Sequence, residues 1–280
     1  MSEPEATHDP RATTRTAWTR AVLCDSSATL VRASMDAGFR SYWRAQSEAS
    51  TRIVMDSPPD KEDVRPWLQI RALLASGGVR VPEILAQDVE RGFLLLEDLG
   101  ADTYLHVIDS GNADALFDDA LTQLLKLQSI VPPANLPAYD EAMLERELHL
   151  FDEWFCGLHL GMNLDRAEMK VLDDAYQVLT ENALAQPQVL VHRDFMPRNL
   201  MPVQDRCPDG HPKGPAVLDF QDAVRGPIAY DPVSLFKDAF LSWPAVRVAI
   251  WLEHYHARAS EAGLPVPTLA QFMRDAELIG

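Results

Sequence analysis

The sequence predicts an α+β fold with two lobes, a small β-rich lobe at the amino end followed by a larger, mainly helical one. Its 280 residues are 47% hydrophobic and 24% charged, a composition typical of a globular protein long enough for a second lobe. The first hundred residues hold short apolar, β-branched runs around one helical stretch. The remainder shows helical periodicity, interrupted once by a compact β-rich segment.

The first lobe is expected at 21–98, after a solvated tail at 1–20 that mixes acidic and basic residues and leads into a first helix. A run of β-branched apolar residues predicts a strand at 52–55. Apolar residues at helical spacing predict a helix over 62–76, which Gly77-Gly78 ends.

Two more strands complete this lobe. The runs 84–89 and 93–97 are joined by Glu90-Arg91-Gly92, which is typical of a β-hairpin with glycine at the turn. Leu99-Gly100 then marks a hinge, and we expect the second lobe at 99–280.

The second lobe begins with three amphipathic helical stretches, at 116–128, 143–155 and 171–179. A short buried strand is expected at 189–191. Further on, Asp231-Pro232 is expected to supply the N-cap and the first residue of another helix.

The net charge argues against one class of partner. The chain has 25 Lys and Arg against 42 Asp and Glu, a net charge of −17. Proteins that bind nucleic acid neutralise phosphates with Lys and Arg, so we expect no nucleic-acid partner.

The acidic residues are concentrated in one stretch. Between Glu97 and Glu153 there are thirteen of them, against Lys126 and Arg146 alone. We interpret them as solvated helix faces, and the alternative is an acidic wall that attracts a cationic substrate.

The cysteines and the apolar runs indicate a cytoplasmic protein without membrane contact. Cys24, Cys156 and Cys207 are too widely spaced for a disulfide framework or a zinc site, which favours a reducing compartment. No uncharged apolar run approaches the roughly 20 residues that span a bilayer, and the first twenty residues lack the apolar core of a secretory signal.

The most informative motif is the run from Val191 to Asn199, which contains His192-Arg193-Asp194, four further residues and an asparagine. This is the spacing of a kinase catalytic loop. Such a loop needs a carboxylate that accepts the proton of the substrate hydroxyl, and an amide oxygen that ligates magnesium. Asp194 and Asn199 supply these two groups.

A second carboxylate follows twenty residues later, where Leu218-Asp219-Phe220 ends a short strand. If 199–203 and 215–219 pair as antiparallel strands, Asn199 and Asp219 lie opposite each other at the open end of a hairpin. Two oxygen ligands then converge on one cation, which suits Mg²⁺ shared between protein and nucleotide phosphates.

The parts that would hold a nucleotide are less marked. No G-x-G-x-x-G opens the chain, since 33–40 offers only Gly38, and the strand at 52–55 lacks the Lys that pairs with phosphates in protein kinases. Arg40 or Arg44 is a candidate for that contact, with surface solvation as the alternative. Glu97 to Leu99 would place backbone groups against an adenine, or would simply end the hairpin.

Taken together, these residues resemble the aminoglycoside phosphotransferase and choline kinase family of small-molecule kinases. The similarity rests on four segments and covers most of the chain from about Ser34 onward: 53–59, 92–100, 189–201 and 218–227. Tyr230-Asp231 and 240–244 extend it. Within the family, the run Gln221 to Gly226 and the strand ending in Met55-Asp56 are most similar to the bacterial anomeric kinases of N-acetylmuramate and N-acetylglucosamine.

The resemblance implies a bilobal protein-kinase-like fold and ATP-dependent phosphorylation of the anomeric hydroxyl of an amino sugar. The product would be a sugar 1-phosphate that feeds UDP-sugar salvage during cell-wall recycling. In this interpretation Asp194 is the base and Asn199 and Asp219 hold Mg²⁺. The nucleotide contacts are Glu97, Leu99 and Arg40.

The substrate contacts suggested by the same resemblance are Arg198, Arg225 and Gln221. Either arginine would neutralise a phosphate or the lactyl carboxylate, with a structural ion pair as the alternative. This chain departs from the family's pattern at 267–280, because relatives continue there through further helices with basic residues. Either the sequence is cut there or this member is short, and we expect an incomplete carboxyl end.

Two other functions remain open on sequence alone. An aminoglycoside or other cationic-substrate kinase would suit the acidic stretch after Glu97. A pseudokinase that binds nucleotide without turnover would suit the absent Lys and the sparse glycine loop, although Asp194, Asn199 and Asp219 are all present. The sequence does not predict the oligomeric state.

Overall fold

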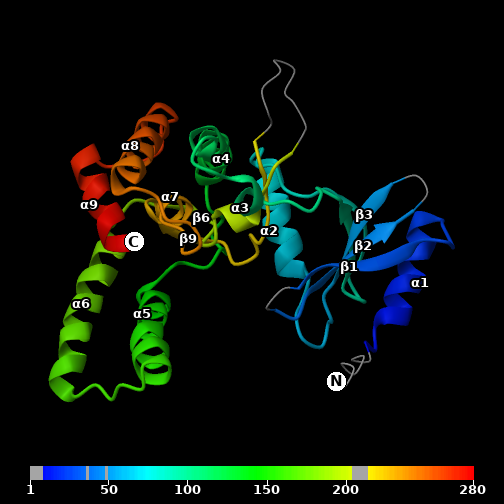
Figure 1. Ribbon diagram of the computed structural model, residues 1–280, viewed down its shortest axis with the longest axis horizontal. Helices are drawn as coiled ribbons and strands as arrows, with labels where there is room; N and C mark the ends of the chain where they lie inside the picture. Colours follow the sequence, from blue (N-terminus) through cyan, green and yellow to red (C-terminus); the bar gives the residue numbers. More distant parts are fainter. Residues whose placement is uncertain (1–8, 36–37, 48–49, 204–213) are drawn as a thin grey trace. The chain divides into compact units, whose positions relative to one another are not determined.

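The computed structural model describes residues 9–35, 38–47, 50–203 and 214–280. It contains two compact units: the first comprises Met1–Gln69 with Pro82–Ala101, and the second comprises Ile70–Val81 with Asp102–Gly280. Figure 1 shows the β-rich composition of the first and the helical composition of the second, as the sequence predicted. Cys207 and residues 36–37 of the sparse glycine segment lie outside the described residues.

The first unit is built on a five-stranded antiparallel sheet with the order β1-β2-β3-β5-β4. The expected strands and the hairpin are confirmed, and two further strands precede them. The strands are β1 (Thr29–Met35), β2 (Ser41–Gln46), β3 (Thr51–Asp56), β4 (Ile84–Asp88) and β5 (Phe93–Glu97).

Gly92 makes the β4–β5 turn possible. Its φ of 71° lies in the left-handed region, and a Cβ atom there would come within 1.8 Å of the Ser57 carbonyl oxygen. That oxygen is close because the Ser57 amide donates to the Gly92 carbonyl (2.9 Å). Only glycine fits this close approach of two backbones.

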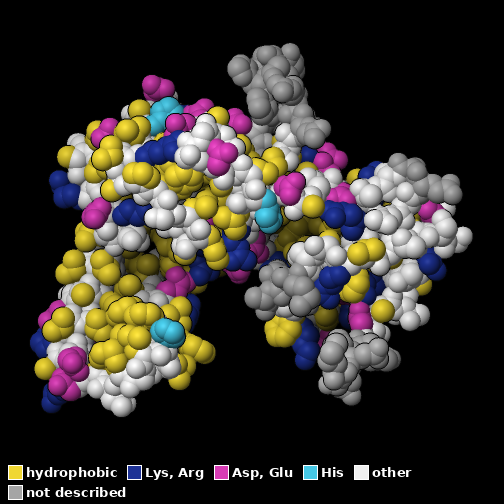
Figure 2. Space-filling model, in the orientation of Figure 1, with side chains coloured by type: hydrophobic (Ala, Val, Ile, Leu, Met, Phe, Trp, Pro, Cys, Tyr) yellow, Lys and Arg dark blue, Asp and Glu magenta, His cyan; other side chains and the backbone are white. Residues whose placement is uncertain are grey.

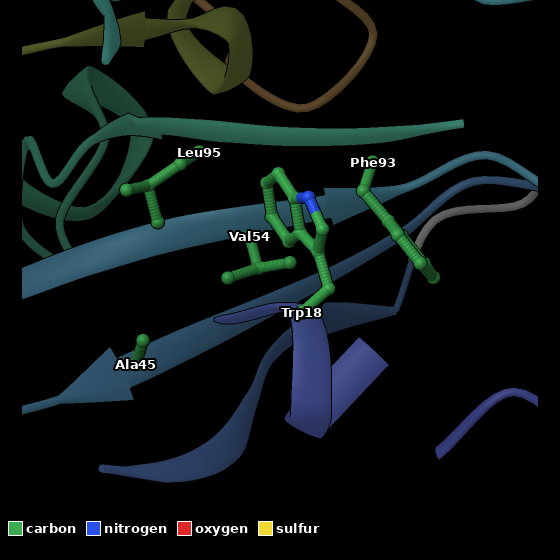
Figure 3. Close-up of a cluster of buried hydrophobic side chains, with 5 residues drawn as sticks. All are labelled: Trp18, Ala45, Val54, Phe93 and Leu95. Carbon is green, nitrogen blue, oxygen red and sulfur yellow. The ribbon is translucent and has the colours of Figure 1, made fainter. Parts of the chain in front are cut away.

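Helix α1 (Ala12–Leu23) packs against the sheet through Trp18. Figure 3 shows the Trp18 ring among side chains of β2, β3 and β5, and its centroid is 5.4 Å from that of Phe93. The sequence-based expectation of a solvated tail through residue 20 is therefore wrong for residues 12–20.

Buried charge fixes the same helix. Asp56, at the end of β3, is 1% exposed and accepts hydrogen bonds from Arg11 Nε (2.7 Å) and Arg15 Nη1 (2.8 Å). The Arg15 guanidinium also lies 3.7 Å from the ring centroid of Trp43. Two cations on one buried carboxylate satisfy the charge that burial would otherwise penalise.

Helix α2 (Arg65–Ser76) connects the two units in the chain and ends at Gly77-Gly78, as predicted. The second unit is mainly helical. Its helices are α3 (Tyr104–Val107), α4 (Ala113–Gln128), α5 (Glu141–Leu150), the π-helix η1 (Phe151–His159), α6 (Arg166–Ala185), α7 (Tyr230–Phe236), α8 (Ala245–Glu261) and α9 (Leu269–Ile279).

The β-rich interruption consists of two short antiparallel pairs. Strand β6 (Gln188–Val191) pairs with β9 (Val224–Pro227), and β7 (Leu200–Met201) pairs with β8 (Ala216–Val217). A 3-10 turn, η2 (Pro197–Asn199), leads into β7.

Helices α4, α7 and α8 meet at an aromatic cluster. Phe117 makes edge contacts with Phe236, Trp243 and Trp251, at centroid distances of 5.3, 6.0 and 4.7 Å. Elsewhere in this unit, Figure 2 shows hydrophobic side chains gathered on the surface of the α5–α6 hairpin. No helix among the described residues is long and apolar enough to cross a bilayer.

We predict that Trp18→Ala destabilises the first unit by about 3–5 kcal/mol, because it removes a large buried ring from the cluster of Figure 3. Urea unfolding followed by circular dichroism measures the loss. Val22→Ala, on a more exposed position of the same helix, should cost less than about 1 kcal/mol. Equal losses for the two variants would show that Trp18 does not anchor α1.

Candidate active site

The His192-Arg193-Asp194 segment follows β6 directly, and hydrogen bonds to its backbone hold it in place. Asp194 is half-buried, and the Asn199 side chain folds back so that Nδ2 donates to the Asp194 carbonyl (2.9 Å). This contact leaves Oδ1 as the remaining acceptor of the carboxamide. Arg193 adopts the left-handed φ of 77°, which redirects the chain between His192 and Asp194.

The buried His192 ring joins this loop to the β8 segment. The Asp194 amide donates to Nδ1 (3.2 Å), so the proton is on Nε2, which donates to the Leu218 carbonyl (2.9 Å). Burial lowers the pKa of His192 to about 4, which keeps the ring neutral. A neutral imidazole can therefore make both bonds near neutral pH.

Asp231 holds the same loop from the opposite side. Its buried carboxylate accepts from the backbone amides of His192 (2.8 Å) and Arg193 (3.0 Å). Burial raises the pKa of Asp231 to about 7, although the two amide bonds oppose that rise. The predicted N-cap role of Asp231 is wrong, because α7 begins at Tyr230 and Ala229 is at its N-cap. The Asp231 carboxylate bonds to the loop that carries Asp194 instead.

The predicted hairpin is present, but its register differs by one residue. Leu200 pairs with Val217, and the Leu218 amide donates to the Asn199 carbonyl (2.9 Å), so Asn199 is opposite Leu218 rather than Asp219. Asn199 is the last residue of the 3-10 turn η2, and β7 begins only at Leu200.

Asp219 leaves the strand with a left-handed φ of 60°. Among the described residues only three non-glycine residues have positive φ, and two of them, Arg193 and Asp219, border this site. Such strained backbone is concentrated at functional sites, where surrounding contacts hold it in place.

The three predicted residues therefore lie on segments that are hydrogen-bonded to one another. Asn199 is bonded to the backbone of both Asp194 and Leu218, and Asp219 follows Leu218 directly. Burial raises the pKa of Asp194, and electrostatic repulsion from Asp219 and Asp222 raises it further. Raising the pKa of a carboxylate toward neutral pH suits a general base.

The donor set fits a hard divalent cation. Asn199 and Asp219 offer oxygen atoms, and no group of three or more His, Cys, Asp or Glu within the described ranges could hold a metal by itself. Two protein oxygens with remaining positions for water and phosphate suit Mg²⁺ rather than zinc.

The three predicted substrate contacts have different surroundings. Gln221 Nε2 donates to Asp219 Oδ1 (3.0 Å) and Asp222 Oδ2 (3.1 Å). Arg198 is exposed, with its guanidinium 5.3 Å from the Phe240 ring centroid. Arg225 lies on β9 with an exposed side chain.

The predicted nucleotide contacts belong to the first unit. Arg40 is buried, and its Nε lies 3.4 Å from Glu62 Oε1. Glu97 and Leu99 are half-buried at and after the end of β5. Arg44 is not a solvated side chain: it makes two bonds to Asp98 (2.7 and 3.1 Å) and one to the Gly100 carbonyl (2.6 Å), which fixes the segment after Glu97.

One set of contacts was not predicted from the sequence. The Arg193 side chain pairs with Glu147 of α5, and the other oxygen of Glu147 accepts from the Tyr139 hydroxyl. Arg193 therefore has a carboxylate partner other than Asp194. The chain gave no spacing signal for this pair, because the two residues lie 46 positions apart.

The chain matches the profile of the phosphotransferase enzyme family over residues 29–269. Two relatives bear the name N-acetylmuramate/N-acetylglucosamine kinase. The one from Pseudomonas putida is 47% identical over 98% of this chain and 81% of its own length. The one from Pseudomonas aeruginosa is 48% identical over 90% of this chain and 73% of its own length.

Solved structures agree on the fold at much lower identity. An aminoglycoside-3'-phosphotransferase of type VIII superposes with a TM-score of 0.61 at 12% identity, covering 97% of this chain and 98% of its own.

We predict that His192 makes stability depend on pH. The unfolded chain protonates this ring near pH 6.5 and the folded protein only near pH 4, so the stabilisation is complete above pH 6.5 and disappears as the pH falls to about 4. The difference between the two pKa values contributes about 3 kcal/mol to the free energy of unfolding. Urea unfolding at a series of pH values measures it.

The comparison variant is His192→Asn, which does not titrate in this range and should lack this part of the pH dependence. His254→Asn, at an exposed histidine, should retain it. If the wild-type and His192→Asn curves ran parallel between pH 6.5 and 4, the neutral buried ring would not be the cause.

Proposed function

The chain belongs to the phosphotransferase enzyme family, and from that premise we propose that it is an ATP-dependent kinase of the amino sugars N-acetylmuramate and N-acetylglucosamine. The observation that carries the proposal is the convergence of Asp194, Asn199 and the Asp219 segment through direct hydrogen bonds. The phosphoryl acceptor is the hydroxyl on the anomeric carbon, and the product is a sugar 1-phosphate.

In the proposed reaction Asp194 orients the anomeric hydroxyl and accepts its proton. That hydroxyl is more acidic than an ordinary alcohol, so a carboxylate whose pKa is raised by burial is a sufficient base. Asn199 Oδ1 and the Asp219 carboxylate would hold Mg²⁺, which, when bound, offsets the charge of the transferring phosphoryl group. Positioning of the two reactants supplies much of the remaining acceleration.

We assign the nucleotide contacts to the first unit. Glu97 and Leu99 offer backbone groups to the adenine, and the Arg44–Asp98 pair supports that segment. Arg40 is proposed as a phosphate contact in place of the strand Lys. Its pairing with Glu62 is analogous to the cation–carboxylate pair of protein kinases.

The substrate side carries two exposed cations. Arg198 is close enough to Asp194 to lower its pKa electrostatically, and we propose that it neutralises phosphate or the substrate carboxylate. Arg225 is the second candidate for that carboxylate. Gln221 contributes by orienting Asp219, in addition to any contact with the sugar.

A cationic substrate is less well supported. Four acids of the stretch Glu97 to Glu153 are already paired with arginines, which reduces the attraction that the stretch exerts on a cation: Asp98, Asp114, Asp118 and Glu147. At physiological salt, screening weakens the attraction of the remaining acids for a cation beyond about 8 Å.

A substrate panel tests the proposal. ADP release is measured with N-acetylmuramate, N-acetylglucosamine and kanamycin, and phosphorus NMR identifies the product. We expect turnover of the amino sugars with a 1-phosphate product. Turnover of kanamycin alone would establish the cationic-substrate function instead, and ATP binding without any product would establish a pseudokinase.

We predict that Asp194→Ala lowers kcat by about 100- to 10,000-fold, because the proton acceptor is lost. ATP affinity, measured by isothermal titration calorimetry, should change by less than about threefold. Asp173→Ala, at an exposed carboxylate of α6, is the matched control and should keep wild-type turnover. A near-normal rate for Asp194→Ala would remove the base assignment.

A further inference from the structure

Arg193 occupies a strained position immediately before the proposed base. Its φ of 77° lies in the left-handed region, which costs a non-glycine residue free energy unless surrounding contacts hold it there. The next residue is Asp194, so any relaxation of the Arg193 backbone would move the Asp194 carboxylate. The position of that carboxylate therefore depends on the contacts that fix Arg193.

Contacts on both the backbone and the side chain fix Arg193. Its amide donates to Asp231 Oδ1 (3.0 Å), and its guanidinium, through Nη2, donates to Glu147 Oε1 on α5. The amide lies before the φ and ψ bonds of Arg193, so the Asp231 contact alone does not determine where the chain leads next. The side chain branches from Cα between those two bonds, and its pairing with Glu147 supplies the second anchor.

Glu147 is itself held by a pair of tyrosines. Its Oε2 accepts from the Tyr139 hydroxyl. Burial raises the pKa of Tyr139, so the hydroxyl stays protonated and available as a donor. The Tyr139 ring centroid lies 5.5 Å from the guanidinium carbon of Arg193, and the ring makes an edge contact with Tyr230 at a centroid distance of 5.3 Å. The carboxylate that pairs with Arg193 is therefore fixed in place.

These contacts form a closed set around the loop. Tyr230 directly precedes Asp231, whose carboxylate accepts from the Arg193 amide. The Tyr139 amide donates to the carbonyl of Arg225 (2.8 Å) on β9, and β9 pairs with β6, the strand immediately before the loop. The backbone anchor and the side-chain anchor of Arg193 therefore belong to one connected set of contacts.

A plain surface ion pair is the alternative for Arg193 and Glu147, whose side chains are 24% and 28% exposed. Exposed ion pairs contribute little to stability and constrain little. Two observations favour a role in positioning. The pair is attached to a residue with left-handed backbone, and a tyrosine hydroxyl fixes its carboxylate.

We propose that Glu147 is a positioning residue for phosphoryl transfer. Through the Arg193 side chain it holds the turn before Asp194, so that the Asp194 carboxylate faces the acceptor hydroxyl. Tyr139 fixes the Glu147 carboxylate for this task. The role rests on the proposed function and adds the residues that hold the base in place. A displacement of about 1 Å at a reacting group is enough to lower a rate by about 100-fold, so a distant anchor can affect kcat.

Steady-state kinetics with N-acetylglucosamine and ATP tests this role, with kcat expressed per ATP-binding site counted by isothermal titration calorimetry. Glu147→Ala should lower kcat by about 10- to 100-fold and leave the KM for sugar and for ATP within about twofold, because only the placement of the base changes. Glu147→Gln keeps an acceptor oxygen for Arg193 and should restore kcat to within about fivefold of the wild type.

A double-variant cycle tests whether Glu147 acts through Arg193. Arg193→Gly removes the side-chain anchor alone, because glycine adopts the same φ without strain. It should lower kcat about as much as Glu147→Ala does. The double variant should lose no more than about twofold beyond the more affected single variant, because both changes remove the same contact. Independent structural damage would instead multiply the two losses.

The matched control is Glu145→Ala, which removes an exposed carboxylate two positions away on the same helix. It should leave kcat within about twofold of the wild type, because a surface substitution on α5 without a link to Arg193 does not reach the loop.

The outcomes separate the positioning role from the proposed function. If the wild type phosphorylates the sugar and Glu147→Ala keeps kcat within about twofold, the positioning role is wrong and the kinase function stands. If the losses multiply in the double variant, or if Glu147→Ala raises the KM for sugar instead of lowering kcat, Glu147 does not act through Arg193 and the role is overturned. If the wild type does not phosphorylate an amino sugar, the proposed function fails and this role fails with it.

Discussion

The neutral, buried ring of His192 is the contact on which the candidate site depends. One ring nitrogen accepts from the Asp194 amide, and the other donates to the carbonyl of Leu218, the residue between β8 and Asp219. The Asp231 carboxylate accepts from the His192 and Arg193 amides, so backbone hydrogen bonds position the loop that carries Asp194. Burial raises the pKa of Asp194, and electrostatic repulsion from Asp219 raises it further, so a bound cation would relieve that repulsion.

The site also shows how charge is distributed in a strongly acidic protein. The Arg193 guanidinium, adjacent to Asp194 in the chain, pairs with Glu147, and Arg44 pairs with Asp98. These arginines are used to fix backbone segments near the proposed base and the proposed adenine contact. Arg198 and Arg225 remain exposed, and we propose both as contacts for an anionic substrate.

Much of this could be predicted from the sequence because the signals are local. The spacing from His192 to Asn199, the short apolar runs that form strands and Gly92 at the turn each depend on residues a few positions apart. The predictions that failed depend on distant partners. Asp231 has the local pattern of a helix cap, but its carboxylate bonds to amides 38 and 39 positions away. Residues 12–20 have the composition of a tail, but Arg15 pairs with Asp56 and the Trp18 ring packs against Phe93. The apolar periodicity likewise does not predict the 3-10 turn that ends at Asn199 or the register of the strand pair that follows it.

We propose that Asn199 and Asp219 hold one divalent ion beside Asp194. A crystal structure with Mg²⁺ and a non-hydrolysable ATP analogue tests it most directly. We expect an ion about 2.1 Å from both Asn199 Oδ1 and an Asp219 oxygen, with the phosphates completing its coordination. An ion bound elsewhere, with these two side chains turned away from the phosphates, would contradict it.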